Sequence, residues 1–338
     1  MVGALTPWNY PQILAMSKIA PALGAGCTIV LKPSPETALD PYLLGDAALE
    51  AGLPPGVLNI VLAGYEVGAS LVRHPGVDKV AFTGSTAAGR AIGAECGRLI
   101  RRCTLELGGK SAAIFLEDAD IDTIIAGLGA ASFANNSQTC TTQSRILAPR
   151  SRYEEVVDAV GTFARELSVG NPLDPTVTCG PMACEQHLNR VLGYIEIACQ
   201  SNARLITGGG RPATQNRGWF VEPTVFADVD NHDELARAEV FGPVIAVIPY
   251  DGDDEAIAIA NDSNFGLAGS VWTPDEDRGI ALASRIRTGT IGVNYYRVDC
   301  GAPFGGMKDS GIGREYGSEA MENYLEYQSV YASAAQLP

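Results

Sequence analysis

The chain has 338 residues, of which 46% are hydrophobic and 19% charged, and its 24 basic against 39 acidic residues give a formal charge of −15. This negative charge repels phosphate backbones and anionic membrane surfaces, so we expect no nucleic-acid and no membrane partner. The length predicts two domains, and the absence of a long apolar run or a basic leader at the N-terminus favours a cytoplasmic protein.

Strands, small-residue turns and helices alternate along the first hundred residues. A helix over 12–23 is followed by strands over 27–31, 56–61, 78–82 and 103–107, with a helix after each of the first three. This order predicts a parallel sheet covered on both faces. Lys32 follows one strand, where open parallel sheets bind ligands, and Gly84 with Ser85 precedes a helix, where backbone N–H groups suit a phosphate.

Two polar side chains in this region are candidates for chemistry. Asn9 lies in a turn between Pro7 and Pro11, where its amide can donate into a cleft or cap the following helix. Glu106 is a lone carboxylate in an apolar strand. Burial would raise its pKa and suit it to general-base work, whereas a solvent-facing position would leave it without a role.

A second α/β region begins near residue 111. Helices are expected over 121–134, 153–167, 182–201, 254–261 and 276–286, with strands over 145–148, 205–207, 244–250, 270–272 and 290–294. Two glycine- and proline-rich segments, 238–243 and 302–315, interrupt this region, and long loops of this kind are usually functional. The segment 294–300 is expected to line the mouth of a substrate site.

Cys140 lies in a polar turn, 133–145, between two apolar elements. Such a turn can surround a nucleophilic thiolate with backbone N–H groups, although a single cysteine is more often a buried core residue. The eight cysteines include no Cys-x-x-Cys pair, which is typical of reduced thiols. Cys179, Cys184 and His187 match no standard zinc spacing, so we predict no metal site.

Seven motifs, in order along nearly the whole chain, resemble the aldehyde dehydrogenase superfamily. They are Pro7-Trp-Asn-Tyr-Pro11, Lys32-Pro-Ser34, Phe82-Thr-Gly-Ser-Thr86, Leu105-Glu-Leu-Gly-Gly-Lys110, Ser137-Gln-Thr-Cys140, Glu239-Val-Phe-Gly-Pro243 and Pro303-Phe-Gly-Gly-Met-Lys308. The resemblance implies a Rossmann-like parallel-sheet cofactor domain over 1–108 and a second α/β catalytic domain over 109–317. It also implies a C-terminal oligomerisation strand within 318–338, for which 324–331 is the candidate, and a homo-oligomer (dimer or tetramer).

The resemblance also implies roles for individual residues. Cys140 matches the nucleophile, Glu106 the general base, Asn9 an oxyanion donor, and Lys18 with Glu315 a supporting pair for proton relay. The matching cofactor-binding positions are Trp8, Lys32, Pro35, Gly64, Gly84, Ser85, Leu107, Glu239 and Phe241.

The implied reaction is NAD(P)-dependent oxidation of a small-molecule aldehyde to the carboxylic acid through a thiohemiacetal and a thioester. This chemistry calls for a lowered pKa at Cys140 and a raised pKa at Glu106.

Three features depart from the family pattern. Ser137 replaces a usual glycine, and Pro35 stands where NAD-preferring members often have a glutamate, so NAD is expected with NADP open. The chain begins almost at Pro7, without the helices and hairpin that family members carry upstream. We therefore expect exposed apolar surface around Ile29 and Val30.

Two alternative functions fit less of the sequence. A CoA-acylating enzyme typically lacks the general-base glutamate, so Glu106 argues against it. A non-catalytic relative with a binding or assembly role is supported only by the shortened N-terminus.

Overall fold

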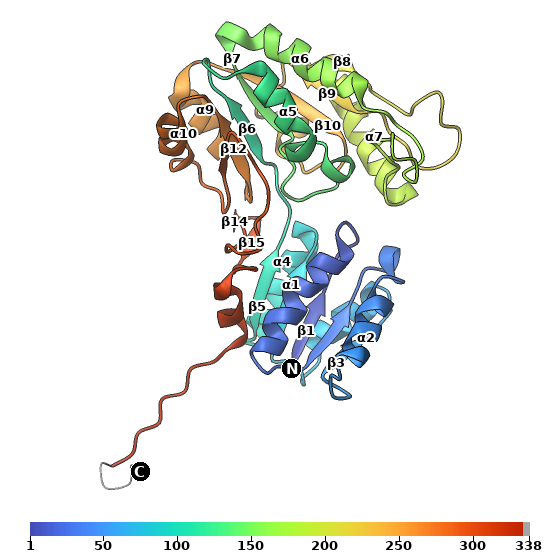
Figure 1. The fold of residues 1–338 in the computed structure, drawn as a ribbon, viewed down its shortest axis with the longest axis vertical. Coiled ribbons are helices and arrows are strands. Elements are labelled where there is room, and N and C mark those ends of the chain that lie inside the picture. Colours follow the sequence, from blue (N-terminus) through green and yellow to red (C-terminus); the bar gives the residue numbers. More distant parts are fainter. Residues whose placement is uncertain (334–338) are drawn as a thin grey trace.

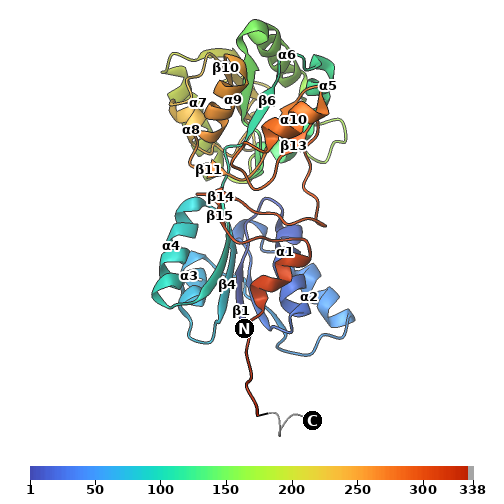
Figure 2. The ribbon, with the colours of Figure 1, turned by 90° about the vertical axis from the view of Figure 1, so that its left-hand side faces the viewer.

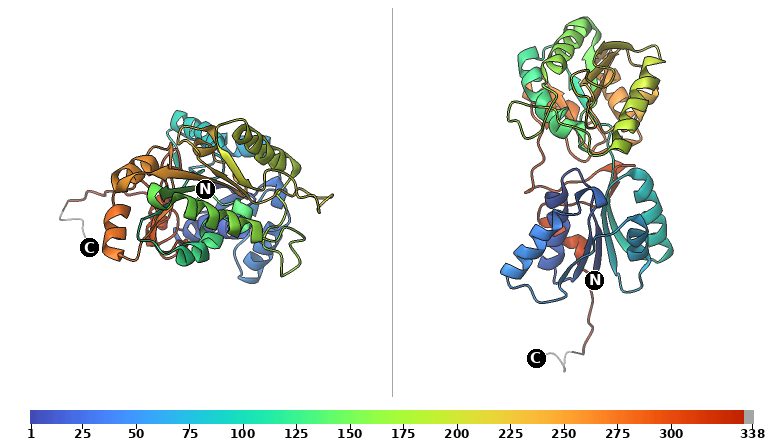
Figure 3. Two further views of the ribbon diagram at one scale, coloured as in Figure 1. Left: turned by 90° about the horizontal axis from the view of Figure 1, so that it is seen from above. Right: turned by 90° about the vertical axis from the view of Figure 1, so that its right-hand side faces the viewer.

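Two large β-sheets, of six and seven strands, organise residues 1–333, the part of the chain that the computed structural model describes (Figure 1). Each sheet is covered by its own helices and has its own buried apolar clusters. The chain therefore forms two α/β bodies, which Figure 3 shows one above the other. The predicted α/β class is confirmed.

The first sheet combines five parallel strands with one antiparallel strand from near the C-terminus. Its strands are β1 (Val2–Leu5), β2 (Ile29–Lys32), β3 (Leu58–Ile60), β4 (Lys79–Thr83), β5 (Arg102–Glu106) and β15 (Gly311–Ile312). They lie in the order β15-β5-β4-β1-β2-β3. Because parallel strands end at the same edge, the loops after β1, β2, β4 and β5 gather there.

Helices cover both faces of this sheet (Figure 2). The helices α1 (Pro11–Gly24) and α2 (Pro41–Glu50) lie on one face, and α3 (Tyr65–Arg73) and α4 (Thr86–Arg98) lie on the other. Ile29 is 0% exposed because Ala15 and Ile19 of α1 pack in the same cluster, and Val30 is only partly exposed. The expected exposure is therefore wrong for Ile29 and correct in part for Val30.

The sequence did not reveal β1, although it lies at the centre of the first sheet between β2 and β4. All four of its residues are buried. A short strand buried on both faces has no alternation of apolar and polar residues, so its pattern does not identify it.

The second sheet is built from the middle of the chain. Its strands are β6 (Ala112–Phe115), β7 (Arg145–Pro149), β8 (Arg204–Thr207), β9 (Thr224–Ala227), β10 (Val244–Tyr250), β12 (Gly269–Trp272) and β13 (Gly292–Val293). They lie in the order β13-β12-β6-β7-β10-β9-β8, and only β8 is antiparallel to its neighbour. A separate short ladder pairs β11 (Phe265–Gly266) with β14 (Met307–Lys308).

Two groups of helices enclose the second sheet. One face is covered by α5 (Ile121–Ala131) and α6 (Tyr153–Glu166). The other is covered by α7 (Glu185–Cys199), α8 (Glu234–Arg237), α9 (Gly252–Asn261) and α10 (Glu276–Ala283). Nowhere in residues 1–333 is a helix both long and apolar enough to cross a membrane.

After β14 the chain returns to the first body. β15 pairs with β5, and a 3₁₀ turn over Ser318–Tyr324 packs against α1. The strand predicted over 324–331 is not formed within the single chain: residues 325–333 have no regular secondary structure and extend away from the fold (Figure 1). None of the described strands pairs with this segment, and Tyr327, Val330 and Tyr331 are exposed. Its role in oligomerisation stays a prediction. The rest of the predicted segment, 334–338, lies outside the described residues.

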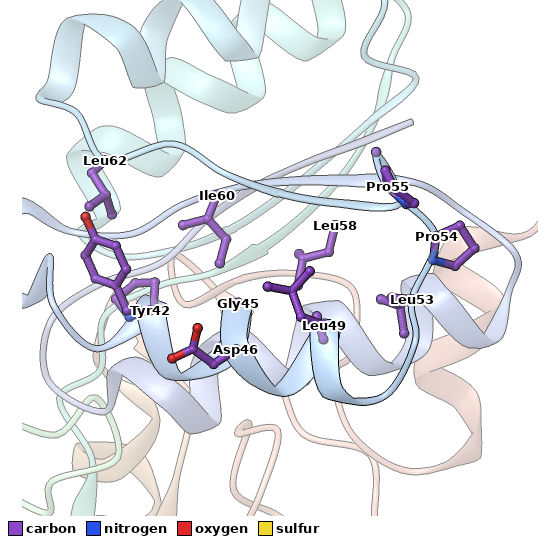
Figure 4. Close-up of a pocket in the computed structure, with 13 residues that line it drawn as sticks. Tyr42, Gly45, Asp46, Leu49, Leu53, Pro54, Pro55, Leu58, Ile60 and Leu62 are labelled. Atoms are coloured by element: carbon purple, nitrogen blue, oxygen red, sulfur yellow. The ribbon is translucent and has the colours of Figure 1, made fainter.

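The outer edge of the first sheet carries an apolar groove of about 370 Å³ between α2 and β3 (Figure 4). Tyr42 and Leu49 line it from the helix, and Leu58 and Ile60 line it from the strand. No predicted site residue borders this groove.

Two glycines of α5 give a matched test of its packing. A Cβ on Gly127 would lie 2.1 Å from the buried Trp272 ring, whereas the nearest atom to a Cβ on Gly129 is 3.7 Å away, in Phe163. We expect Gly127→Ala to lower the free energy of unfolding by about 1–3 kcal/mol through overpacking. Gly129→Ala should leave it unchanged or raise it by up to about 1 kcal/mol through helix propensity. Urea denaturation measures both, and equal effects would contradict the described packing.

Candidate active site

A cleft of about 250 Å³ lies between the two bodies, at the edge where the parallel strands of the first sheet end. The first body contributes the loops after β1, β4 and β5, and the second contributes the Cys140 loop, α7 and the segment before β10. The residues that line the cleft are Pro7, Trp8, Asn9, Thr83, Gly84, Ser85, Leu107, Gly108, Cys140, His187, Arg190, Glu239 and Phe241. Both bodies thus contribute side chains to one cavity.

The Cys140 loop is held in an unusual backbone conformation. Asn135, Asn136 and Ser137 all have left-handed backbone angles, with φ of 52°, 55° and 58°. Ser137, where the family usually has glycine, adopts this conformation with its side chain fully buried and its hydroxyl donating to the Ser132 carbonyl at 2.6 Å. A network of backbone and side-chain hydrogen bonds therefore fixes the loop.

Two neighbours set the position of Cys140. A Cβ on Gly109 would lie 2.2 Å from the Cys140 carbonyl oxygen, so glycine is needed for the loop to approach the end of β5. The Asn9 side-chain Nδ2 donates to the Gln138 carbonyl at 3.0 Å, which places its amide in the cleft beside the thiol loop. A primary amide has two N–H groups, so one can still serve a substrate oxygen.

The electrostatic environment of Cys140 differs from the expectation. Burial raises the pKa of the Cys140 thiol to about 12, the Glu239 and Glu106 carboxylates add to this, and the backbone N–H groups of Cys140 and Thr141 oppose it. The predicted lowering of the pKa is therefore wrong in this structure. Sequence reasoning recognised the backbone donors and not the two carboxylates that act on the same thiol.

Glu106 is buried and has a raised pKa, as the sequence predicted. It is 3% exposed, and neither carboxylate oxygen has a hydrogen-bond partner among residues 1–333. Burial, with the Glu315 charge, raises the pKa of Glu106 well above its ordinary value, and Lys18 and Arg314 oppose the shift. A Cβ on Gly305 would lie 2.6 Å from Glu106 Oε1, so this glycine leaves room for the carboxyl group.

Lys18 and Glu315 form a buried ion pair whose two charges act on Glu106. Lys18 Nζ lies 2.7 Å from Glu315 Oε1, and the side chains are 0% and 4% exposed. Lys18 also donates to Thr83 Oγ1 at 2.7 Å, and Ser17 Oγ donates to Glu315 Oε2 at 2.8 Å. The pair therefore links α1, β4 and the loop that follows β15.

The first-body side of the cleft combines a helix N-terminus with a bare backbone. Ser85 caps α4 by accepting from the Ala88 N–H at 3.3 Å. A Cβ on Gly84 would lie 2.5 Å from the Phe82 ring, so only glycine fits there. Leu107 completes this wall. The N–H groups of the first turn of α4 give this side the partial positive charge that suits an anion.

The second-body side presents a carboxylate and aromatic rings. Glu239 accepts from the Gly109 N–H at 2.8 Å, and burial raises the pKa of Glu239 to about 7. The Trp8 ring packs edge-on against His187 at 5.2 Å and against Phe241 at 5.5 Å between centroids. A flat apolar ring system and a hydrogen-bond acceptor thus border the same space.

Lys32, Pro35 and Gly64 lie outside this cleft, at the ends of β2 and β3. Lys32 Nζ donates to the Pro33 carbonyl at 2.9 Å, and burial lowers the pKa of Lys32. Gly64 caps α3 without a side-chain bond. Pro35 begins a short 3₁₀ turn, and the next residue, Glu36, accepts from Ser34 Oγ and from Tyr65 OH. The carboxylate at this strand end therefore belongs to Glu36.

Two cleft residues escaped the sequence analysis as site residues. His187 Nε2 lies 2.6 Å from the Phe241 carbonyl, and burial lowers the pKa of His187. Arg190 donates to the Glu239 carbonyl at 2.7 Å. The signal was their spacing of three residues on α7, which places both on one helix face. No metal-binding cluster occurs among residues 1–333. The His187 ring packs against Trp8 and Phe241 in the aromatic wall.

The predicted substrate segment lines a separate pocket of about 210 Å³. Residues 295–299 border it together with Thr290 and Phe304, and the Tyr296 hydroxyl lies 2.8 Å from Thr290 Oγ1. Cys140 does not line this pocket. Burial and the charge of Cys140 raise the pKa of Tyr296, so this tyrosine lies within electrostatic reach of the thiol.

Removing one partner of the buried Lys18–Glu315 ion pair should destabilise the folded chain. Lys18→Met or Glu315→Leu should each lower the free energy of unfolding by about 3–5 kcal/mol, because each leaves a buried charge unpaired. The double variant should lower the free energy of unfolding by less than the sum of the two single-variant losses. Arg90→Ala, which breaks the exposed pair with Asp309, is the control and should cost at most about 1 kcal/mol. A single-variant loss near the control value would show that the pair is solvated.

The raised pKa of Glu106 predicts a pH-dependent stability. Above its ordinary pKa of 4.5 the unfolded state releases the proton that the folded state keeps, so this contribution to stability falls as pH rises toward the folded pKa. The glutamine of Glu106→Gln does not titrate. Between pH 4 and pH 8 the free energy of unfolding of this variant should therefore rise by more than about 1 kcal/mol relative to that of the wild type. Asp120→Asn is the control: hydrogen bonds from Thr123 lower the pKa of the exposed Asp120 below 3.8, so its effect lies below this pH range and its curve should run nearly parallel to the wild type. Thermal unfolding at both pH values measures the difference, and a Glu106→Gln curve parallel to the wild type would contradict the shift.

Comparison with known proteins agrees with this geometry. The model of the aldehyde dehydrogenase family matches residues 1–330. Geranial dehydrogenase of Castellaniella defragrans is 56% identical over 98% of this chain and 69% of its own length. Phenylacetaldehyde dehydrogenase of Pseudomonas fluorescens is 44% identical over 98% of this chain and 66% of its own length. The chain thus spans about two thirds of the length of these relatives.

Solved structures show the same fold. A Mycobacterium tuberculosis aldehyde dehydrogenase complexed with NAD+ superimposes with a TM-score of 0.94 at 53% identity, covering 96% of this chain and 67% of that one. A Bacillus cereus aldehyde dehydrogenase in its NAD+ complex superimposes with a TM-score of 0.95 at 42% identity. The match covers 98% of this chain and 68% of that one. The chain belongs to the aldehyde dehydrogenase family.

Proposed function

We propose that this chain oxidises an aldehyde to the carboxylic acid with NAD as hydride acceptor. The observation that carries the proposal is the meeting of a cysteine thiol, an amide donor and a buried carboxyl group without hydrogen-bond partners at one strand edge. Cys140 and Asn9 line the same cleft, and the charge of Glu106 acts on the thiol. A protein that only binds or assembles has no use for a buried, unpartnered carboxyl group, which costs free energy.

The cleft fits a nicotinamide dinucleotide. Gly84 and Ser85 with the N-terminus of α4 suit the phosphates, Glu239 suits the nicotinamide ribose, and Trp8 and Phe241 suit the ring. When bound, the cofactor supplies the hydride acceptor. The carboxylate of Glu36 beside Lys32 favours NAD over NADP, because it can accept from ribose hydroxyls and repels a 2′-phosphate. The M. tuberculosis and B. cereus relatives are both described as NAD+ complexes.

The residues divide the reaction into two steps. Cys140 Sγ adds to the aldehyde carbon, and the Asn9 amide and the Cys140 backbone N–H donate to the resulting oxyanion. Loss of hydride from that carbon leaves a thioester on Cys140. Glu106 then takes a proton from the water that attacks the thioester, and the carboxylic acid leaves.

The protonation states predict how turnover depends on pH. Burial keeps the proton on both the Cys140 thiol and the Glu106 carboxyl group, whose pKa values are raised. Both groups must lose their protons to react, so turnover should rise from neutral toward alkaline pH.

Two variants test the assignment. Cys140→Ala should abolish NADH production while NAD still binds, because the phosphate and ribose groups lie on other loops. Glu106→Gln should release about one NADH per site and then stall, because the base acts after hydride loss. Stopped-flow absorbance follows the burst, and cofactor titration measures binding. If Glu106→Gln shows the same NADH burst and the same steady-state turnover as the wild type, Glu106 is not the base of this mechanism.

The same experiment also distinguishes the two alternative functions, a CoA-acylating enzyme and a non-catalytic relative. Steady turnover that requires CoA would identify an acylating enzyme. Tight NAD binding without any burst, across aliphatic and aromatic aldehydes, would favour a non-catalytic binding role.

A further inference from the structure

A small cavity lies at one end of the second sheet, where β6, β7 and β12 begin. Its volume is about 20 Å³, which is room for a single water or an ion of similar size. None of its lining residues is acidic, and those that are basic or carry a hydroxyl are Lys110, Ser111, Arg145, Arg287 and Thr288. The cavity therefore has a positive border without a counter-charge of its own.

Strand pairing brings two cations to this border. Arg145 lies opposite Ala112 in the pairing of β6 with β7, and its Nε donates to the Lys110 carbonyl at 3.1 Å. Burial and the Arg145 charge lower the pKa of Lys110 to about 7, and Glu239 opposes the shift. The two basic side chains therefore lie close enough to repel each other.

Neither cation is neutralised within the described chain. Lys110 is 2% exposed and Arg145 is 1% exposed, yet neither forms an ion pair with a carboxylate among residues 1–333. Arg145 donates four hydrogen bonds, all to uncharged oxygens, in Lys110, Asn231, Ile259 and Ala260. Lys110 Nζ has no hydrogen-bond partner in the same part of the chain. A buried charge that is not compensated costs free energy, and a bound anion lowers this cost.

Two hydroxyl groups complete the set of free donors. Ser111 Oγ and Thr288 Oγ1 are buried and, like Lys110 Nζ, find no hydrogen-bond partner within residues 1–333. Both residues line the cavity, and the Ser111 carbonyl accepts from the Arg145 N–H at 3.2 Å, which fixes Ser111 beside the guanidinium group. An ammonium group is only a donor and a hydroxyl can donate, so these groups suit a ligand that only accepts.

We propose that this cavity binds a chloride ion. Chloride only accepts hydrogen bonds, so the Lys110 ammonium group and the two hydroxyls can donate to it together. Its negative charge compensates the two buried cations, which a neutral water does not. The volume of about 20 Å³ excludes sulfate, phosphate and carboxylates.

The chloride site is separate from the Cys140 cleft. None of the basic and hydroxyl residues that line the cavity borders that cleft. Lys110 directly follows Gly109, whose N–H donates to Glu239. The ion therefore holds the beginning of β6 next to the loops of the cleft, whatever reaction the chain catalyses.

The direct test is anomalous diffraction from crystals of the full wild-type chain grown in sodium chloride. At long wavelength chloride gives an anomalous signal and water does not. A peak in the cavity in contact with Lys110 Nζ is the expected result. Density without an anomalous peak would mean an ordered water only, and that outcome, like the absence of any density, would overturn the proposal.

Thermal unfolding tests the same site in solution. Sodium chloride replaces sodium gluconate at constant ionic strength, because gluconate is too large for the cavity. The melting temperature of the wild type should rise with chloride, since an ion that binds only the folded chain stabilises it. A melting temperature that does not depend on chloride would contradict binding.

Three variants separate the site from general salt effects. Lys110→Met should abolish the chloride-dependent rise, and Thr288→Val, which removes one donor, should require about tenfold more chloride for the same rise. Lys79→Met is the control, because Lys79 is a buried lysine of the first body that does not line the cavity, and it should keep the full dependence. Circular dichroism confirms that each variant is folded, and Thr288→Val decides the test where Lys110→Met is not. Wild-type chloride dependence in Lys110→Met, or an unchanged chloride requirement in Thr288→Val, would overturn the proposal.

Discussion

The buried ion pair between Lys18 and Glu315 is the contact on which the arrangement of the site depends. Neither side chain can reach water, so each charge is balanced by the other and by hydroxyls of Ser17 and Thr83. Because desolvating a charge is costly, a displacement of either partner carries a large penalty. The pair therefore fixes the position of the C-terminal loop against α1 and β4, close to where Glu106 needs both space and the neighbouring negative charge.

Glycines and left-handed residues provide the space in which the reactive groups meet. Gly109 lets the Cys140 loop approach the end of β5, and Gly305 leaves room for the Glu106 carboxyl group. At both places a side chain would overlap an atom of the site. The glycine-rich motifs therefore act through close contact more than through flexibility, and the hydrogen bonds around Ser137 keep the loop from relaxing.

The sequence predicted most elements and most of the cleft, since both depend on local patterns. Alternating strands and helices identified the parallel sheet, and the motifs at strand ends named Asn9, Cys140 and Glu239, which the cleft brings together. Features that depend on distant contacts were missed. β1 has no pattern of its own, and the pKa of Cys140 depends in part on carboxylates from β5 and from the segment before β10. The strand expected over 324–331 would need a partner strand, and none of the described strands pairs with residues 325–333.

The place of β15 in the first sheet has a consequence for how the chain folds during synthesis. β5 receives its neighbour from residues 311–312, about two hundred positions later, after the whole second sheet has been made. The ribosome therefore releases the second body while one edge of the first sheet is still open. Contacts between residues so far apart in sequence form slowly, and an open strand edge invites association with other chains. Chaperones that shield nascent edges would act on β5, the strand that ends in Glu106.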